Sequence, residues 1–154
     1  MGESDAFAAL EEAPTTARLL AVLARSLVGL LAAEACLISR AIGEMLVDLV
    51  EHSDDRELPG GHGYLISDFP ATQQVLKDRR GATVFVGDAD ADAHEVELLR
   101  KLGFAALLMV PIVVGDDTWG LAEVYREQPF AAADIDRAAP VVAHAAKLIS
   151  RLEA

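Results

Sequence analysis

The chain has 154 residues, of which 53% are hydrophobic and only 5% aromatic, so it can bury the core of one domain. Its 13 basic and 25 acidic residues give a net charge of −12, which repels phosphate backbones and argues against nucleic-acid binding. A single cysteine excludes an internal disulfide, and the most apolar run, residues 19–33, is shorter than the ~20 residues of a membrane span. We therefore expect a cytoplasmic domain that contacts neither nucleic acid nor membrane.

The N-terminal part begins with an Ala-rich polar segment. Residues 1–14 are expected to be a disordered lead-in to a single domain over residues 15–154. Thr15 or Thr16 can cap a helix that starts there. In that helix leucines recur at alternating steps of three and four residues, a coiled-coil-like stripe made by Leu20, Leu23, Leu27 and Leu30.

Two extended runs follow, joined by a short connection. Residues 36–42 and 45–52 are separated by Gly43-Glu44, and a glycine-first connection of two residues suits a type II′ hairpin. Cys36 lies in the first run, where a buried and unreactive thiol is expected. The next segment, residues 53–63, is polar and Gly-rich and predicts a loop, after which residues 64–66 predict a short strand.

The middle of the chain alternates helix and strand. Residues 69–80 predict a helix with a proline in its first turn, where proline is tolerated, and residues 82–86 predict a strand. Asp92 then caps a further helix, with Glu95 three residues later as in a capping box. Gly103 is the expected end of that helix.

The last third contains the best-formed elements. Residues 107–125 read LLMVPIVVGDDTWGLAEVY, which predicts an antiparallel hairpin because three turn residues cannot form a parallel crossover. Pro111 in the first run favours an edge position or a bulge. A final helix is expected over residues 132–152, with a kink at Pro140. The order of elements predicts an α+β domain with an antiparallel central sheet of five to six strands and flanking helices.

Several short motifs follow one another along residues 109–135. They are Met109-Val110-Pro111-Ile112, Trp119-Gly120-Leu121, Tyr125, Pro129-Phe130 and Asp134-Ile135. On these motifs the chain resembles a GAF domain over roughly residues 15–152, of the bacterial type found ahead of diguanylate cyclase and other output domains. The resemblance implies a PAS-like, profilin-type architecture, a role in signal transduction, and an output domain C-terminal to this one in a longer chain.

Composition argues against three chemistries known in this family. Ser67-Asp68-Phe69-Pro70 resembles the Ser-Asp-Ile-Pro segment of phytochrome GAF domains, but no cysteine follows Cys36, so a bilin cannot attach at the usual downstream position. The chain has no asparagine and so lacks the Asn-Lys-x-Asp motif of cyclic-nucleotide-binding members. The methionine sulfoxide reductases of this family need two cooperating cysteines, and this chain has one.

No pattern predicts a metal, a cofactor or a catalytic residue, and we expect no enzymatic activity. Asp88-x-Asp90-x-Asp92 resembles the start of an EF-hand, but Ala93 and Leu99 stand where that loop needs glycine and glutamate. His62 and His94 fall in the region that covers the pocket of GAF domains. Either could be an axial haem ligand, and the alternative for both is an ordinary loop histidine.

The leading hypothesis is a regulatory sensor domain that binds a small ligand between the sheet and residues 64–104. Such a pocket needs an apolar lining with a few polar anchors. Glu123 is unusual between two apolar neighbours, and its side chain either reaches solvent or lines the pocket. If the family geometry holds, the pocket residues are Tyr64, Phe69, Thr72, His94, Leu98, Met109 and Glu123.

Two other functions stay open: a ligand-free module for dimerisation and signal coupling, and a haem-binding gas or redox sensor.

For the leading hypothesis we also expect a homodimer, because the first and last helices carry apolar residues around more than one face. The alternative is that these side chains pack on the domain's own sheet. The expected interface residues are Leu20, Leu23, Leu27, Leu30, Ile135, Val142 and Ile149.

Overall fold

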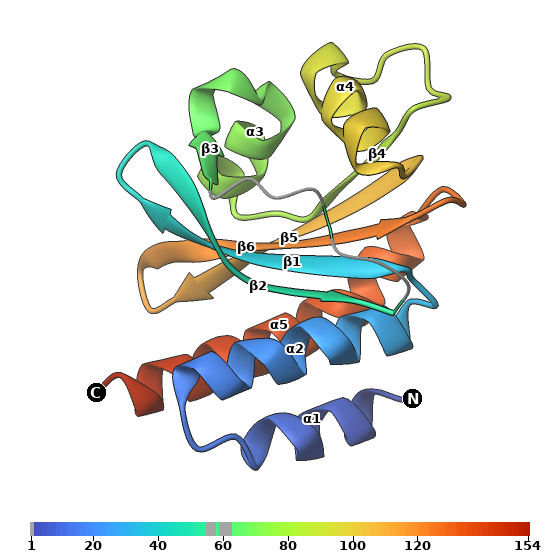
Figure 1. Cartoon of the computed structure of the whole chain (residues 1–154). Coiled ribbons are helices and arrows are strands. Elements are labelled where there is room, and N and C mark those ends of the chain that lie inside the picture. The colour runs from blue at the N-terminus through green and yellow to red at the C-terminus, as the bar shows by residue number, and fades with distance from the viewer. Residues whose placement is uncertain (1, 55–57, 59–62) are drawn as a thin grey trace.

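The computed structural model describes residues 2–54, 58 and 63–154 (Figure 1). In chain order the elements are α1 (Glu3–Glu11), α2 (Thr16–Leu30), β1 (Ala35–Ile42), β2 (Met45–Ser53), β3 (Gly63–Leu65), a 3₁₀ turn (Ile66–Asp68), α3 (Pro70–Asp78), β4 (Ala82–Phe85), α4 (Ala93–Leu102), β5 (Ala106–Val114), β6 (Asp117–Arg126) and α5 (Ala132–Leu152). The strands and helices predicted from residue 15 onward are all present, with ends within a few residues of the expected ones.

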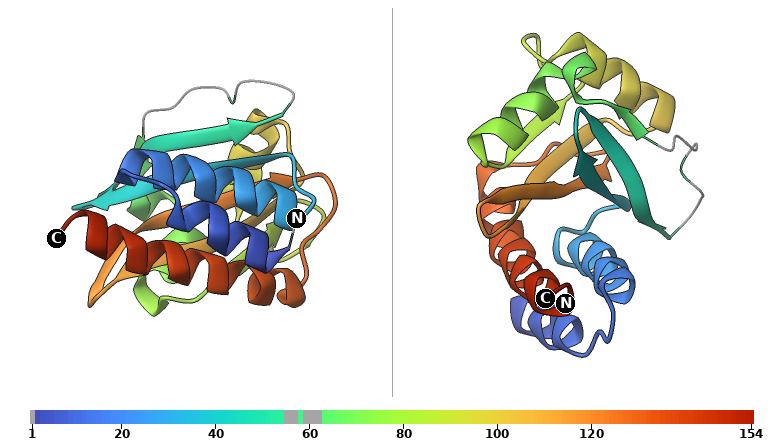
Figure 2. Two further views of the ribbon diagram at one scale, coloured as in Figure 1. Left: turned by 90° about the horizontal axis from the view of Figure 1, so that it is seen from below. Right: turned by 90° about the vertical axis from the view of Figure 1, so that its left-hand side faces the viewer.

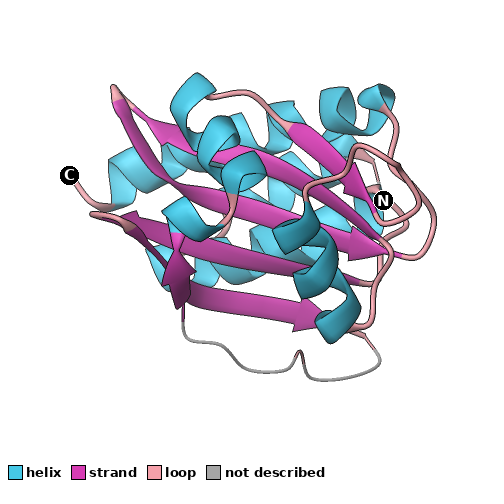
Figure 3. Cartoon of the chain, turned by 90° about the horizontal axis from the view of Figure 1, so that it is seen from above, coloured by secondary structure: helices cyan, strands magenta, loops and turns pink. Residues whose placement is uncertain are grey.

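The six strands form one antiparallel sheet in the order β3-β2-β1-β6-β5-β4. Helices α1, α2 and α5 lie on one side of this sheet, whereas α3 and α4 lie on the other (Figures 1 and 3). The sheet is strongly curved, and the curvature carries β3 up beside α3 (Figures 1 and 2). The predicted α+β architecture is therefore confirmed, with six strands.

The central strands are buried on both faces. Leu108 and Val110 belong to the apolar core beneath α2 and α5, whereas Leu107 and Met109 belong to a second core beneath α3 and α4. Strands covered on both sides are expected to be continuously apolar rather than alternating. This explains the apolar runs of the β5–β6 hairpin, and it means that a polar side chain on either face is removed from water.

Pro111 is tolerated because of where β4 ends. The last residue of β5 that pairs with β4 is Met109, opposite Ala82, so the outer edge of β5 has no neighbouring strand at Pro111. The register between β5 and β6 also shifts between Ile112 and Val113. Both conditions predicted for this proline, an unpaired edge and a bulge, are therefore met in its immediate vicinity.

The N-terminal segment differs from the disordered lead-in expected for residues 1–14. Residues 3–11 form α1, which lies along α2 and α5 on their outer side (Figure 2). Ala6 and Leu10 are buried, and the ring of Phe7 lies over that of His144 on α5 with centroids 4.6 Å apart. Alanine has the highest helix propensity, so the Ala-rich segment forms a helix once Leu10 has a surface to pack on.

The ladder expected to form a dimer interface is buried inside the single chain. Its leucines on α2 and its residues on α5 share one core with α1, and Ile135 packs against that core from a partly buried position. The members are Leu20, Leu23, Leu27, Leu30, Val142 and Ile149, none more than 6% exposed. Because α1 and the sheet already cover these side chains, the ladder is not free to meet a second copy.

Arg126, the last residue of β6, ties the ends of the two long helices together. Its guanidinium donates to the carbonyl oxygen of Leu31 at 2.7 Å, at the end of α2, and to Asp134 at 3.2 Å, in the first turn of α5. Asp134 also accepts from the backbone N–H of Ala131 at 2.8 Å, which satisfies the N–H of the N-cap residue, although the alanine side chain itself accepts nothing from the helix. α5 then continues through Pro140 to Leu152.

Candidate functional site

A group of polar side chains lies inside the core between the sheet and helices α3 and α4. We call it the polar cluster, and it consists of Tyr64, Thr72, Glu95, Glu123 and Tyr125. Thr72, Glu95 and Glu123 are at most 1% exposed. Burial of polar groups is unfavourable unless they are hydrogen-bonded, so the contacts within the cluster matter for stability.

Glu123 is the centre of the cluster. It lies on β6 on the side of the sheet that faces α3 and α4, and it is completely buried. Tyr64 donates a hydrogen bond to one carboxyl oxygen at 3.1 Å, and Tyr125 donates to the other at 2.9 Å. The sequence allowed the Glu123 side chain either to reach solvent or to line the pocket, and in the structure it points inward.

Thr72 links α3 to both α4 and the sheet. Its hydroxyl donates to the Glu95 carboxyl on α4, and it also lies 3.4 Å from the sulfur of Met109 on β5. Thr72 is on the inner side of α3, and Glu95 is on the inner side of α4, one residue after His94. The hydroxyl therefore lies where the two helices and the sheet meet.

The cluster holds two carboxyl groups that are both reluctant to ionise. Burial, with the nearby Glu95 carboxyl as a second cause, raises the pKa of Glu123 to about 8. The pKa of Glu95 is also raised, again chiefly by burial. The pKa of each tyrosine in the cluster is raised by burial and by Glu123. At neutral pH the Glu123 carboxyl therefore keeps its proton, and it can both donate and accept hydrogen bonds.

Aromatic rings lie above the cluster at its outer edge. Phe69, just before α3, contacts Tyr64 edge-on at 4.5 Å between centroids and His94 at 6.5 Å. The His94 side chain is 66% exposed and lies 3.8 Å from Asp92, the residue that caps α4. His94 therefore lies at the rim rather than inside.

Four of the seven predicted pocket residues come together in or against the cluster, namely Tyr64, Thr72, Met109 and Glu123. Phe69 and His94 lie at the rim. Leu98 is only partly buried on α4, and the next residue, Leu99, has its side chain in the apolar core that contains Met109. Which of the two neighbouring leucines faces the sheet depends on the rotation of α4 about its own axis, and adjacent leucines in the sequence do not determine that rotation.

Two members of the cluster, Glu95 and Tyr125, are not among the predicted pocket residues. The sequence predicts only a helix-capping role for Glu95, yet it precedes Leu98, Leu99 and Leu102 by three, four and seven residues, the spacing of one helix face. Tyr125 is two residues after Glu123, so both side chains point to the same side of β6. The helical spacing of Glu95 and the strand alternation of Tyr125 are therefore the sequence signals that point to these two residues.

Cys36 is buried, as predicted from the sequence. Cys36 is fully buried in the core beneath α2 and α5, on the opposite side of the sheet from the polar cluster, and burial raises the pKa of its thiol. Within the described residues no group of histidine, cysteine or acidic side chains could hold a metal ion, and no helix is both long and apolar enough to cross a bilayer. His62 and its neighbouring glycines lie outside the described residues.

The sequence model of the GAF domain family matches residues 15–149, which is most of the chain. The chain belongs to the GAF domain family. No curated protein matches it. In this GAF domain the polar cluster lies on the face of the sheet covered by α3 and α4, and the long helices α2 and α5 pack on the other face (Figure 1).

The fold is shared with solved GAF domains of light receptors. A phycocyanobilin-bound GAF domain from a cyanobacterial phytochrome is 15% identical with a TM-score of 0.84, and the match covers 99% of this chain and 96% of that one. The chromophore-binding domain of a bacteriophytochrome from R. palustris is 13% identical with a TM-score of 0.82, over 97% of this chain and 60% of that one. The PixJ GAF domain of Thermosynechococcus elongatus is 18% identical with a TM-score of 0.74, over 90% and 86%.

Proposed function

We propose that this GAF domain is the regulatory sensor of a bacterial signalling chain and binds a small organic ligand at the polar cluster. The observation that carries the proposal is that four buried hydrogen-bonding side chains, two of them carboxyl groups, and the partly buried Tyr64 occupy a core that apolar residues could fill. Buried polar networks are less stable than apolar packing unless every member is satisfied, so they point to a use other than stability. Solved relatives with bound phycocyanobilin or biliverdin provide a precedent for a ligand in this fold.

The proposed ligand enters between β3, α3 and α4. A polar group of the ligand would replace the Tyr64 hydrogen bond to Glu123 or the Thr72 bond to Glu95, and its apolar part would contact Phe69 and Met109. Because Thr72 and Glu95 join two separate helices, such an exchange would shift α3 and α4 relative to the sheet. Covalent bilin attachment is not part of the proposal, because Cys36 lies on the other side of the sheet.

The route from the site to the long helices is short. Tyr125, which bonds Glu123, is followed directly by Arg126, which holds the end of α2 and the start of α5. A displacement of β6 would therefore reach both long helices. We propose that the domain acts as a homodimer, catalyses no reaction, and passes this displacement to an output domain C-terminal to α5 in a longer chain.

A ligand-free coupling module is the second candidate, and one observation favours it. The polar side chains of the cluster already satisfy one another, as they would in a pocket closed by its own residues. In this case the domain would act through dimerisation alone. A haem sensor has less support, because His94 is largely exposed at the rim.

Native mass spectrometry of gently purified protein separates the two candidates. We expect a non-covalent small-molecule adduct on the wild-type chain that is lost in Thr72→Val and Glu123→Leu. Ser26→Ala, a buried polar change on the opposite side of the sheet, is the matched control and should keep the adduct. An adduct that survives in both cluster variants would place the ligand elsewhere, and its absence from the wild-type chain would favour the ligand-free module.

A further inference from the structure

A groove lies between the end of β5 and the outer side of α5, and the proposed ligand site does not use it. It has a volume of about 460 Å³ and is lined by Val113, by Gly115 in the turn after β5, and by the second half of α5. Three of its α5 residues have small side chains, namely Ala143, Ala146 and Ser150. These small side chains leave room for another chain to lie along the edge of β5.

The outer edge of β5 has no strand partner in this groove. The backbone N–H of Val86 donates to the carbonyl oxygen of Ala105 at 2.9 Å, and β4 stays in register with β5 up to Met109. Alternate residues of an antiparallel strand direct their N–H and C=O groups to the same neighbour, so Ala105 and Met109 face β4. Beyond Met109 none of the described residues forms a backbone hydrogen bond with this edge.

Val113 presents the first available backbone N–H beyond β4. By the same alternation Pro111 and Val113 face outward, and proline has no N–H to donate. The register shift after Ile112 adds its extra residue to β6, so the alternation along β5 is unbroken. Val113 is partly exposed, whereas Pro111 is buried. An extended segment can therefore pair with β5 at Val113, and Pro111 keeps the paired stretch short.

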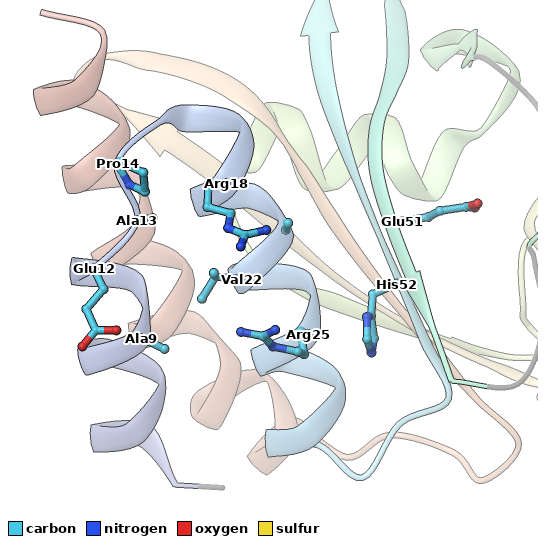
Figure 4. Close-up of a pocket in the computed structure, with 10 residues that line it drawn as sticks. Ala9, Glu12, Ala13, Pro14, Arg18, Val22, Arg25, Glu51 and His52 are labelled. Atoms are coloured by element: carbon cyan, nitrogen blue, oxygen red, sulfur yellow. The ribbon is translucent and has the colours of Figure 1, made fainter.

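The groove is basic in an acidic chain. Its charged lining residues are Lys147 and Arg151, both exposed on α5, and neither has an acidic partner within the part of the chain that the structure describes. None of the described residues that line it is acidic. The larger groove along α1 and α2 differs, because two glutamates line it together with two arginines (Figure 4). In a chain with a net charge of −12, the groove at β5 is thus complementary to an acidic partner.

The spacing of the two cations matches that of an extended peptide. Lys147 and Arg151 are four residues apart on one helix face, a rise of about 6 Å. Side chains two residues apart on a strand point to the same side and lie about 6.6–6.8 Å apart. Ile135, in the first turn of α5, lies next to Gly81 where β4 begins. Arg151, in the last turn, lines the groove with Gly115, so α5 follows β5 and an added strand would lie along both.

We propose that this groove binds an acidic, extended segment of a partner protein, which adds a short strand to the edge of β5. The backbone of the segment pairs with the N–H and C=O groups of Val113. Two acidic side chains of the segment, two residues apart, pair with Lys147 and Arg151. In strand addition the main-chain bonds provide affinity and the side chains provide specificity, so the charges select the partner. The proposal does not depend on a ligand at the polar cluster.

Fluorescence anisotropy with a labelled, capped nine-residue peptide of alternating valine and glutamate tests the charges. Lys147→Glu combined with Arg151→Glu should bind it at least roughly tenfold more weakly than wild type. A peptide with lysine in place of glutamate should instead prefer that double variant. Lys77→Glu combined with Lys101→Glu makes the same charge change on α3 and α4 and should leave binding unaltered. All four side chains are exposed, so circular dichroism should show both variants folded.

Two further peptides test strand pairing without altering the protein. One is methylated on the backbone nitrogens of its valines, and the other on those of its glutamates. Alternate N–H groups of a strand point to opposite edges, so one of these peptides should bind at least roughly tenfold more weakly and the other should bind as before. Equal binding of both would contradict the added strand.

Three other results would overturn the proposal. The first is a wild-type chain that does not bind the glutamate peptide up to roughly millimolar concentration. The second is a control variant that weakens binding as much as the groove variant does. The third is self-association of the wild-type chain that is lost in the groove variant, which would assign the groove to a second copy. None of these outcomes bears on the ligand, since the native mass measurement reads the polar cluster independently.

Discussion

Tyr64 on the edge strand β3 donates a hydrogen bond to Glu123 on β6, although β2 and β1 lie between these two strands in the sheet. The curvature of the sheet makes this contact possible, because it turns β3 over the face that carries Glu123 (Figure 1). The bond closes one side of the polar cluster, and it couples the edge of the sheet to its centre. Any molecule that enters the cluster from this side must alter it.

Glu123→Gln should flatten the pH dependence of stability. The pKa of Glu123 is raised from 4.5 to about 8 on folding, so the folded chain holds a proton that the unfolded chain releases. Its contribution is complete below pH 4.5 and is lost as the pH rises to about 8. Urea titrations across this range should show wild type losing on the order of a few kcal/mol that the glutamine variant keeps. Equal slopes for both proteins would contradict a protonated Glu123.

Cys36 should be silent both to thiol reagents and to bilins. The thiol is fully buried on the side of the sheet covered by α2 and α5, and its raised pKa disfavours the reactive thiolate. We expect labelling of the folded chain to be at least ~100-fold slower than labelling in denaturant. Ala17→Cys, exposed on α2, is the control and should react at once. A covalent adduct after incubation with phycocyanobilin or biliverdin would contradict the placement of Cys36.

Arg126→Ala should destabilise the domain by about 2–4 kcal/mol. The guanidinium donates to three backbone carbonyl oxygens and to Asp134, and it lies 4.0 Å from the ring centroid of Phe130, so several partners lose their donor together. Arg137→Ala, which removes one hydrogen bond to Leu30 from a half-exposed side chain, should have a smaller effect. Chemical denaturation measures both, and equal losses would show that Arg126 has no special role.

Leu10→Ala should lower the free energy of unfolding by about 2–4 kcal/mol, because Leu10 is 1% exposed in the core shared by α1, α2 and α5. Ala8→Ser, on the exposed side of the same helix, should change it by less than about 0.5 kcal/mol. If Leu10→Ala had no effect, the N-terminal segment would not be packed on the domain in solution.

The fold could be predicted largely from the sequence because its strongest signals are local. The turn at residues 115–116 between two apolar runs fixes the β5–β6 hairpin, and Asp92 and Gly103 mark the two ends of α4. The partners of an apolar helix face cannot be predicted in this way. The leucines of α2 suit a second copy as well as they suit α1 and the sheet, and only the three-dimensional arrangement shows that α1 covers them.

The candidate site was half predictable for a related reason. Glu123 is conspicuous as a lone charge in a strand, so it is readily identified in the sequence. Glu95 is not, since a glutamate three residues after a capping aspartate has an ordinary role at a helix start. Its burial beside Thr72 follows from the way in which α3 and α4 meet over the sheet, a contact between residues 23 positions apart.

Hydrogen–deuterium exchange tests the central claim, that a ligand occupies the polar cluster, most directly, since it does not require the ligand to be identified first. One sample is the gently purified chain, and the other is the same chain unfolded in denaturant, dialysed and refolded, which removes any non-covalent ligand. A ligand at the cluster predicts slower exchange in the first sample, with the largest difference in α3 and α4. Identical exchange throughout, from samples with identical circular dichroism, would contradict an occupied site and favour the ligand-free coupling module.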